Sequence, residues 1–356
     1  MERILIINPF GIGDVLFTTP VIKAIKDNLP DAFVGYWCNE RVMSVLKDNP
    51  YIDKIFALSR GDLKKIFKVS IFSGIKKSLE LISDLKKERF DICLDFSLDH
   101  RYSMVAKISG AKRRIGFNYK GRGRFLTDKI DIDGYNNKHV VEYYLDLLKF
   151  INIKPKIYYL DLSVSEDSKR KSKSMLDKLG VNDNDLLIGI APGGGASWGK
   201  DASLKHWPAS KFAELADKII KDYNAKILIL GDESERYIAD TIVKETSEEL
   251  IDLVGKTSLE ELISIISNID ILIANDGGTL HIAVALGKKT ISFFGPVDPK
   301  VYGPYPPDEK RHIVLKKTLE CSPCYRNFRL TKCQKNRACL EEISVEQALD
   351  ALSALL

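Results

Sequence analysis

A glycine turn near the start of the chain places a carboxylate where α/β proteins usually bind a ligand. The turn Asn8-Pro-Phe-Gly-Ile-Gly-Asp14 follows the continuous apolar run Arg3–Pro9 and precedes an amphipathic stretch. Gly11 and Gly13 permit a tight bend and a close approach of the backbone to a ligand. Asp14 has two interpretations: it caps the helix that follows, or it serves as a general base for a substrate hydroxyl.

The sequence matches two nucleotide-binding motifs in part, and each match fails at one required position. The first glycine turn begins like a dinucleotide fingerprint, yet Leu16 stands where the third glycine belongs. A second loop, Gly194-x4-Gly199-Lys200, matches a Walker A motif up to Asp201, which replaces the Ser or Thr that binds magnesium. We therefore reject a P-loop NTPase, and the missing third glycine counts against a nicotinamide-dependent oxidoreductase.

Three expected strand ends in the second half carry groups that suit a nucleotide. The loop after Ala191 offers backbone amides, with Lys200 and Lys205 as cations for phosphates, unless it is a flexible surface turn. Asp276 and Thr279, with the amides of Gly277 and Gly278, stand where a diphosphate would be held at a helix start. A further strand ends at Gly231-Asp-Glu233, where a carboxylate suits ribose hydroxyls, while a lone histidine such as His281 is more often structural than catalytic.

Four cysteines lie close together in the last part of the chain, at Cys321, Cys324, Cys333 and Cys339. Four thiolates can hold a structural zinc ion with no open position for catalysis, but the last spacing is longer than in common zinc sites. The alternative is a loop with free or oxidisable thiols, and the spacing alone does not decide between the two.

Positive charge is concentrated in the first half. Between Arg60 and Lys129 there are 18 Lys and Arg against 8 Asp and Glu, a net charge of +10, so the rest of the chain has a net charge of −5. Such asymmetry indicates an anionic partner, namely nucleic acid, a phosphorylated substrate or a membrane surface, unless the lysines are only solvated. No helix-turn-helix, RNA-recognition or zinc-finger signature is present, so we expect no nucleic-acid partner.

The elements that must position these residues alternate between short β-rich runs and amphipathic stretches throughout the 356 residues. This regular alternation predicts an α/β protein with doubly wound parallel sheets. We expect two domains, 1–160 and 161–340, followed by a terminal helix at 341–356 that begins with the capping-box spacing Ser344-x-x-Gln347. No run is long enough for a membrane span, the first residues do not resemble a secretory signal, and the few cysteines favour a reducing cytosol.

Taken together, these segments resemble glycosyltransferase family 9, which contains the lipopolysaccharide heptosyltransferases. The resemblance covers nearly the whole chain and follows its segments in order: Gly13-Asp14, Thr18-Thr-Pro20, Arg114-Ile-Gly-Phe117, Lys205-His-Trp-Pro208, Asn275-Asp-Gly277 with His281, and Phe294-Gly-Pro296. The cysteine-rich segment also looks like one found in many relatives.

The resemblance implies a GT-B fold of two Rossmann-like domains facing across a cleft, the acceptor on the first and the nucleotide-sugar on the second, with a terminal helix that often packs back on the first. It implies an inverting transfer, without a catalytic metal or cofactor, of heptose from ADP-L-glycero-D-manno-heptose to a Kdo or heptose acceptor of the lipopolysaccharide core. Asp14 would be the base, Lys205 the phosphate ligand and Glu233 the ribose ligand.

The candidate residues then form two sets. The donor set is Gly193, Gly194, Ser197, Lys205, Glu233, Asp276, Gly277, Gly278, Thr279 and His281. The acceptor set, chosen mainly by charge and region for an anionic glycolipid at the cytoplasmic face of the inner membrane, is Gly13, Arg60, Lys64, Arg113, Arg122 and Arg124. A GT-B transferase with another nucleotide-sugar and a nucleotide-sugar-binding protein without turnover remain alternatives.

Overall fold

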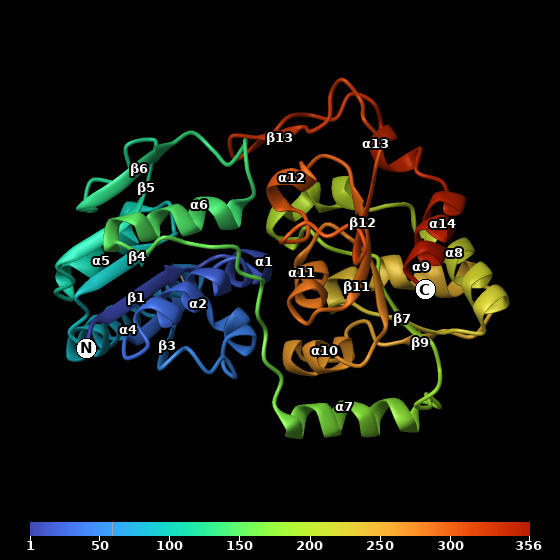
Figure 1. Cartoon of the computed structure of the whole chain (residues 1–356), viewed down its shortest axis with the longest axis horizontal. Helices are drawn as coiled ribbons and strands as arrows, with labels where there is room; N and C mark the ends of the chain where they lie inside the picture. Colours follow the sequence, from blue (N-terminus) through green and yellow to red (C-terminus); the bar gives the residue numbers. More distant parts are fainter. Residues whose placement is uncertain (59) are drawn as a thin grey trace. The chain divides into compact units, whose positions relative to one another are not determined.

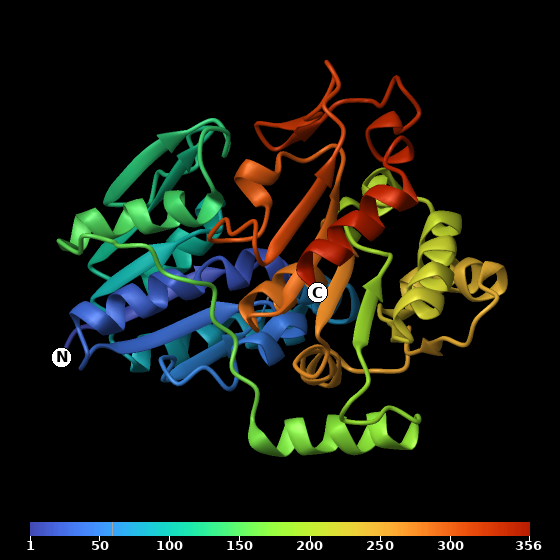
Figure 2. The same ribbon diagram turned by 45° about the vertical axis from the view of Figure 1, so that its right-hand side comes forward.

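The chain folds into two compact units, Met1–Ser163 and Val164–Leu356 (Figure 1). A computed structural model describes residues 1–58 and 60–356, and the side chains of Arg60, Asp62 and Ala196 are not part of that description. Between residues 152 and 165 the chain has no regular secondary structure and runs extended (Figure 2). This segment links the two units.

Unit 1 is built on a six-stranded sheet with strand order β3-β2-β1-β4-β5-β6, and every neighbouring pair is parallel. Its strands are β1 (Arg3–Asn8), β2 (Phe33–Cys38), β3 (Lys54–Ala57), β4 (Ile92–Asp95), β5 (Arg113–Tyr119) and β6 (Asp128–Ile132). The central strand β1 is an uninterrupted apolar run because helices cover both faces of a parallel sheet. Its residues Ile4 to Ile7 have no exposed surface.

Most helical segments of unit 1 connect successive strands, and the last two follow β6. They are α1 (Ile12–Leu16), α2 (Thr19–Asn28), η1 (Glu40–Val45), α3 (Arg60–Val69), α4 (Ile71–Lys87), α5 (His100–Ile108), α6 (Val140–Asp146) and η2 (Leu147–Ile151). One face of the sheet is covered by a core that includes Leu5, Trp37, Phe56, Leu85 and Phe90. The turn between β1 and α1 therefore emerges at the carboxyl edge of a rigid sheet, as expected for a ligand-binding turn.

Unit 2 repeats the plan with strand order β12-β11-β10-β7-β8-β9, again with parallel neighbours. Its strands are β7 (Leu187–Ala191), β8 (Lys226–Ile229), β9 (Ile251–Asp252), β10 (Ile271–Asn275), β11 (Lys289–Phe294) and β12 (His312–Lys316). The main crossover helices are α8 (Ala209–Tyr223), α9 (Arg236–Glu245), α10 (Leu259–Ile266) and α11 (Gly278–Ala285). Together the two sheets confirm the α/β, doubly wound fold class.

The remaining elements of unit 2 are short or lie at its periphery. They are α7 (Glu166–Lys178), η3 (Ala196–Lys205), η4 (Glu233–Glu235), α12 (Pro299–Tyr302), the hairpin β13 (Tyr325–Arg326) and β14 (Arg329–Leu330), α13 (Ala338–Glu341) and α14 (Val345–Leu355). Helix α7 packs beside α10, where the hydroxyl of Ser168 lies 3.1 Å from a carboxylate oxygen of Glu260. No helix of the described residues is long and apolar enough to cross a membrane.

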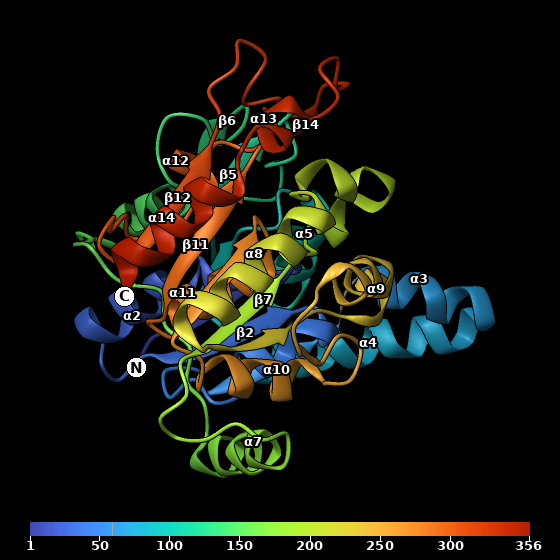
Figure 3. The same ribbon diagram turned by 90° about the vertical axis from the view of Figure 1, so that its right-hand side faces the viewer.

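The terminal helix α14 begins at the expected capping box of Ser344 and Gln347. Its buried face, expected above to cover the first domain, belongs to the core of unit 2, where Ala348, Leu352 and Leu355 lie in the cluster around Phe212. Figure 3 shows α14 beside α8 and β11. The apolar side of α14 packs on β11 and β12 beside α8.

Of the strands in the two six-stranded sheets, β6 and β12 were not expected from the sequence, and both lie at the edge of their sheet. Edge strands pair on one side only and often carry charged residues that discourage aggregation. Three of the five residues of β6 are charged, in the order Asp-Lys-Ile-Asp-Ile. Their polarity hides the apolar run by which a buried strand is recognised.

Candidate active site

The loop that carries Asp14 is held from inside unit 1. The side-chain amide of Asn8, at the end of β1, donates to the backbone carbonyl of Asp14 over 2.9 Å, and its oxygen accepts from the amide of Phe10 at 3.2 Å. Gly11 takes the N-cap position of α1, so Asp14 lies in the first turn of the helix. Asp14 is half-buried, as suits a carboxylate that is ordered and still reachable by solvent or substrate.

Two buried threonines secure the backbone directly after Asp14. The hydroxyl of Thr18 donates to the carbonyl of Val15 over 2.6 Å and lies 2.7 Å from the phenol oxygen of Tyr36 in β2. The hydroxyl of Thr19 donates to Leu16 and accepts from the amide of Asp161 at 2.9 Å. These residues explain the Thr-Thr-Pro sequence as a structural support for the turn.

In unit 2, buried Asn275 joins the glycine loop to the segment before α8. Its side-chain oxygen accepts from the amide of Trp207 at 2.9 Å, and its amide nitrogen donates to the carbonyl of Pro192 over 2.6 Å. Sequence reasoning placed Asn275 in a motif but not in the site. The sequence signal was an asparagine at the end of an apolar strand. Its amide group needs both a hydrogen-bond acceptor and a donor when it is buried, so it is expected to join neighbouring loops.

The two glycine segments of unit 2 approach each other at backbone distance. A Cβ on Gly194 would lie 3.0 Å from the carbonyl oxygen of Asp276, and one on Gly277 would lie 3.1 Å from the Cα of Gly194. Gly194 also has a φ of +117°, which side chains rarely allow. The structure thus brings together Gly194, Asp276 and Gly277 from the donor set.

Lys205 and Asp276 form the most buried ion pair of this region. Nζ of Lys205 lies 2.6 Å from Oδ2 of Asp276, and their side chains are only 11% and 7% exposed. The same ammonium stands 4.4 Å from the ring centre of Trp198, a cation–π contact. Burial of both charges is costly unless they remain paired. Asp276 therefore keeps the ammonium group of Lys205 at the sheet edge where α11 begins.

His281 lies one turn into α11 and is only 4% exposed. Burial lowers the pKa of His281 to about 4; Asp276 opposes this shift and Lys205 adds to it. The imidazole is therefore neutral at pH 7, and it cannot serve as a second cation for a diphosphate. Because His281 is buried in the first half of α11, it suits a residue that positions the start of this helix.

The depressed pKa of His281 predicts that stability falls in mild acid. In the unfolded chain a histidine takes up its proton near pH 6.5, whereas the folded chain resists protonation until about pH 4. Below pH 6.5 the unfolded state therefore binds more protons, and the free energy of unfolding decreases. We expect a loss of about 2 kcal/mol from this residue between pH 7 and pH 5.

Urea unfolding of the wild type and of His281→Gln at the two pH values measures this effect. The variant should lose less stability on acidification than the wild type. His312, whose pKa is also lowered to about 4 mainly by burial, contributes in the same window and remains in both proteins. Equal losses in the two proteins would rule out His281 as a source of the acid sensitivity.

Glu235, which sequence reasoning missed, is the carboxylate that meets the glycine loop. Its Oε1 accepts from the amide of Gly194 at 2.6 Å, and its Oε2 accepts from the amide of Asp232 at 3.1 Å. Burial raises the pKa of Glu235. The signal was the spacing Asp232-x-x-Glu235, a capping box that turns the glutamate back toward the strand end.

A side chain on Gly193 would displace the Glu235 carboxylate from the amides of Gly194 and Asp232. A Cβ on Gly193 would lie 2.0 Å from the Glu235 carboxyl group. Gly193→Ala should therefore destabilise the protein by about 1–3 kcal/mol, as in other overpacked sites. Urea unfolding curves of the wild type and the variant measure this effect.

The double variant Gly193→Ala/Glu235→Ala is the control for this steric argument. Removing the carboxylate opens the space that the new methyl group needs, so the double variant should recover part of the loss. A stability loss in the double variant equal to the sum of the losses in the two single variants would contradict the proposed contact.

Other members of the donor set lie apart from this cluster or only at its rim. Ser197 is exposed in η3, and Glu233 is exposed on η4, where its carboxylate lies against Gly255. Thr279 and the backbone of Gly278 are half-buried in the first turn of α11. That helix start offers backbone amides to an anion.

The acceptor set is scattered over unit 1. Arg113 already forms an ion pair with Asp128 of β6 at 3.2 Å and donates to the carbonyl of Phe150. Arg122 and Arg124 are exposed in the turn between β5 and β6, and Lys64 is exposed on α3. The side chain of Arg60 lies outside the described residues. Gly13 is in α1, next to Asp14.

The four clustered cysteines surround the β13–β14 hairpin and α13. Burial raises the pKa of Cys339 to about 11, and Cys324, Cys333 and Cys321 add to the shift by charge repulsion. Among residues 1–58 and 60–356, no group of three or more His, Cys, Asp or Glu is arranged to hold a metal ion. Structural zinc stays a prediction, with free thiols as its alternative.

Comparisons with known proteins agree on one family. The family model for glycosyltransferase family 9 (heptosyltransferase) matches residues 78–335. Lipopolysaccharide heptosyltransferase 1 of Campylobacter coli is 28% identical over 311 residues, which are 82% of this chain and 84% of that protein.

Solved structures share the fold over nearly the whole chain. A family 9 glycosyl transferase from Veillonella parvula has a TM-score of 0.83 at 22% identity and covers 99% of this chain and 97% of its own. ADP-heptose lps heptosyltransferase II of Escherichia coli has a TM-score of 0.78 at 20% identity, with 100% and 98% covered. Because the family match spans most of the sequence and the fold extends over both units, the chain belongs to glycosyltransferase family 9, the heptosyltransferases, and is a glycosyltransferase of the GT-B fold.

Proposed function

We propose that this enzyme transfers heptose from ADP-L-glycero-D-manno-heptose to the inner core of lipopolysaccharide, with a Kdo or heptose residue as the acceptor. Its curated relatives include lipopolysaccharide and lipooligosaccharide heptosyltransferases. The observation that carries the proposal is the buried Lys205–Asp276 pair beside two glycine segments in direct backbone contact. Such a site suits the diphosphate of a nucleotide-sugar.

The donor half of the mechanism is assigned to unit 2. The ammonium of Lys205 and the amides at the start of α11 would face the diphosphate, whose negative charge grows as the glycosidic bond breaks. Because these groups are preorganised, they would stabilise the departing ADP without a metal ion. Asp276 would keep the lysine oriented, and neutral His281 would support the helix start behind it.

The acceptor half is assigned to Asp14. Its carboxylate would take the proton from the acceptor hydroxyl as that oxygen forms a bond to the anomeric carbon. The bond between the anomeric carbon and the phosphate oxygen breaks at the same time, and ADP leaves with the electron pair. Attack from the face opposite the leaving group inverts the anomeric configuration.

The partners follow from the same proposal. The acceptor is an anionic glycolipid, so we propose that the protein works at the cytoplasmic face of the inner membrane as a peripheral protein. The excess of Lys and Arg between residues 60 and 129 supports this placement by charge.

Thermal stabilisation by a panel of nucleotides tests the donor assignment. A ligand that binds only the folded state raises Tm by mass action. ADP and ADP-heptose should raise Tm, whereas UDP, GDP, CDP and NAD at the same concentration should not. A shift with UDP or GDP would move the protein to another transferase activity, and a shift with NAD would overturn the proposal.

Transfer of heptose to a soluble Kdo-containing acceptor, with release of ADP, tests turnover. A protein that binds ADP-heptose and releases no ADP in the presence of this acceptor would be a binding protein or a transferase for another acceptor.

A further inference from the structure

Helices α3 and α4 form a hairpin whose tip is apolar and exposed. A Cβ on Gly74 would lie 2.4 Å from the Phe67 ring, so the two helices pack closely near their connection. Beyond this contact, the side chains of Val69, Ile71 and Phe72 extend into solvent, with exposed fractions of 89%, 66% and 86%. Figure 3 shows the two helices side by side.

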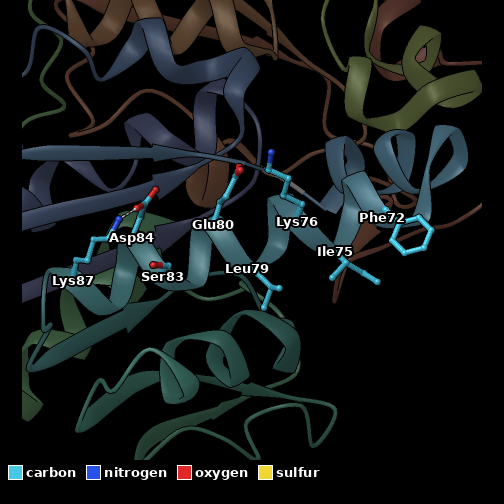
Figure 4. A pocket seen from close by; sticks show the side chains of 8 residues that line it. All are labelled: Phe72, Ile75, Lys76, Leu79, Glu80, Ser83, Asp84 and Lys87. Carbon is cyan, nitrogen blue, oxygen red and sulfur yellow. Dashed lines mark hydrogen bonds and ion pairs between the residues drawn. The ribbon is translucent and has the colours of Figure 1, made fainter.

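A second apolar stripe continues from this tip along α4. Leu81 and Leu85 face the core of unit 1, which accounts for the burial of α4. Phe72, Ile75 and Leu79 follow a helical spacing on a different side of the same helix and remain exposed. They line an open groove of about 520 Å³, and in Figure 4 Ile75 and Leu79 point away from the side on which Lys76 and Glu80 lie. A continuous exposed apolar patch of this kind marks an interaction surface.

The charge around the patch identifies the kind of surface that it fits. Between Leu63 and Leu79 the chain has five lysines and no Asp or Glu; they are Lys64, Lys65, Lys68, Lys76 and Lys77, and all are exposed. Further along α4, Glu80 pairs with Lys77 at 3.7 Å and Asp84 pairs with Lys87 at 2.8 Å. Apolar side chains flanked by lysines match a bilayer interface, where acyl chains lie below anionic headgroups.

We infer that the α3–α4 hairpin docks on a membrane that contains anionic lipids. Val69, Ile71 and Phe72 insert below the headgroups, and the five lysines contact the lipid phosphates. The aliphatic stems of the lysines extend the apolar face while their ammonium groups stay at the headgroup level. The inference rests on the proposed function for its setting, a glycolipid acceptor, but the docking itself depends on the hairpin alone.

Co-sedimentation with vesicles tests the inference on the full chain. The wild type should bind vesicles of phosphatidylcholine mixed with phosphatidylglycerol, and its partition coefficient on phosphatidylcholine alone should be lower by roughly tenfold or more. Val69→Ser/Phe72→Ser should lower binding to the anionic vesicles by about tenfold. The matched control Tyr237→Ser/Val243→Ser removes two exposed apolar side chains of α9 in unit 2 and should bind like the wild type. Equal binding of both double variants and the wild type would overturn the inference.

A second variant tests insertion directly, without loss of apolar surface. Phe72→Trp should show a blue-shifted tryptophan emission with anionic vesicles, and brominated lipids should quench the added emission. No shift and no quenching would overturn the inference. A wild-type dimer in sedimentation that Val69→Ser/Phe72→Ser dissociates, with no vesicle binding, would instead assign the patch to a second copy of the chain.

The outcomes for docking and for the proposed function remain separable. ADP titration and heptose transfer to a soluble acceptor contain no membrane, so the hairpin variants should retain both. Lost vesicle binding with intact transfer is the result expected for these variants. A wild type that transfers heptose but binds no vesicle refutes docking alone, and one that binds vesicles but not ADP refutes the proposed function alone.

Discussion

Asp14→Asn is expected to lower kcat by roughly 10²- to 10⁴-fold, the range that general bases contribute. The amide keeps the shape of the carboxylate but cannot accept the acceptor proton as oxygen attacks the anomeric carbon. The side-chain amide of Asn8 bonds to the backbone carbonyl of residue 14, and the variant keeps this support of the loop.

Initial rates of ADP release, together with calorimetric titration of ADP, distinguish a lost base from a lost fold. The Kd for ADP should stay within about twofold of the wild-type value, because the residues assigned to the donor lie in unit 2. Asp31→Asn, at an exposed aspartate in the turn before β2, is the matched control and should retain full activity. A variant at Asp14 with turnover close to the wild type would eliminate this residue as the base.

Lys205→Met is expected to weaken ADP binding by about 10- to 100-fold, because one charge-assisted hydrogen bond to phosphate contributes about this much to affinity. The change also leaves Asp276 as a buried carboxylate without the ammonium 2.6 Å away. Breaking one side of a buried pair costs about 3–5 kcal/mol, because the remaining charge is still desolvated. The same substitution should therefore lower both affinity and Tm.

The companion variant Lys205→Met/Asp276→Asn separates the two effects. With the buried charge neutralised, stability should return in part, whereas ADP binding should remain weak. Lys244→Ala, at an exposed lysine of α9, should leave the Kd for ADP and the Tm unchanged. An unchanged Kd in Lys205→Met would remove this lysine from the phosphate site.

The buried pair also has a consequence for the donor loop itself. Lys205 contacts both Asp276 and the ring of Trp198, so the η3 segment is attached to the end of β10 through one ammonium group. Trp198 in turn lies 5.1 Å, ring centre to ring centre, from Tyr325 of the β13–β14 hairpin. Loss of the lysine should therefore loosen the loop as well as remove a charge.

Much of the fold could be predicted from local sequence patterns. The apolar runs Phe33–Cys38 and Ile271–Asn275 each coincide with one strand of the structure, because both are buried on two faces. The edge strand β6 was missed because its charged residues interrupt that pattern, and β12 has only three consecutive apolar residues. The terminal helix was located by its capping box, but the sequence could not show which core receives it.

Some residues of the candidate site could likewise be found from the sequence, and others only from the structure. The residue types alone located the turn around Asp14 and the segment from Asp276 to His281, because glycine, carboxylate and helix-start signals are short and local. They did not show which glutamate meets the glycine loop. Glu233 and Glu235 are two positions apart, and the geometry of η4 directs Glu235 to Gly194 while Glu233 lies against Gly255.

The sequence by itself therefore determined the alternation of strands and helices, the caps and the glycine turns, since these depend on neighbours within a few residues. Only the tertiary structure decided that Lys205 pairs with Asp276, 71 residues away, and that the apolar stripe of Phe72, Ile75 and Leu79 faces solvent. The physical reason is that strand order sets which loops meet at a sheet edge and which face of a helix finds a core. The periodicity of one segment shows neither which loops meet at a sheet edge nor which face of a helix is buried.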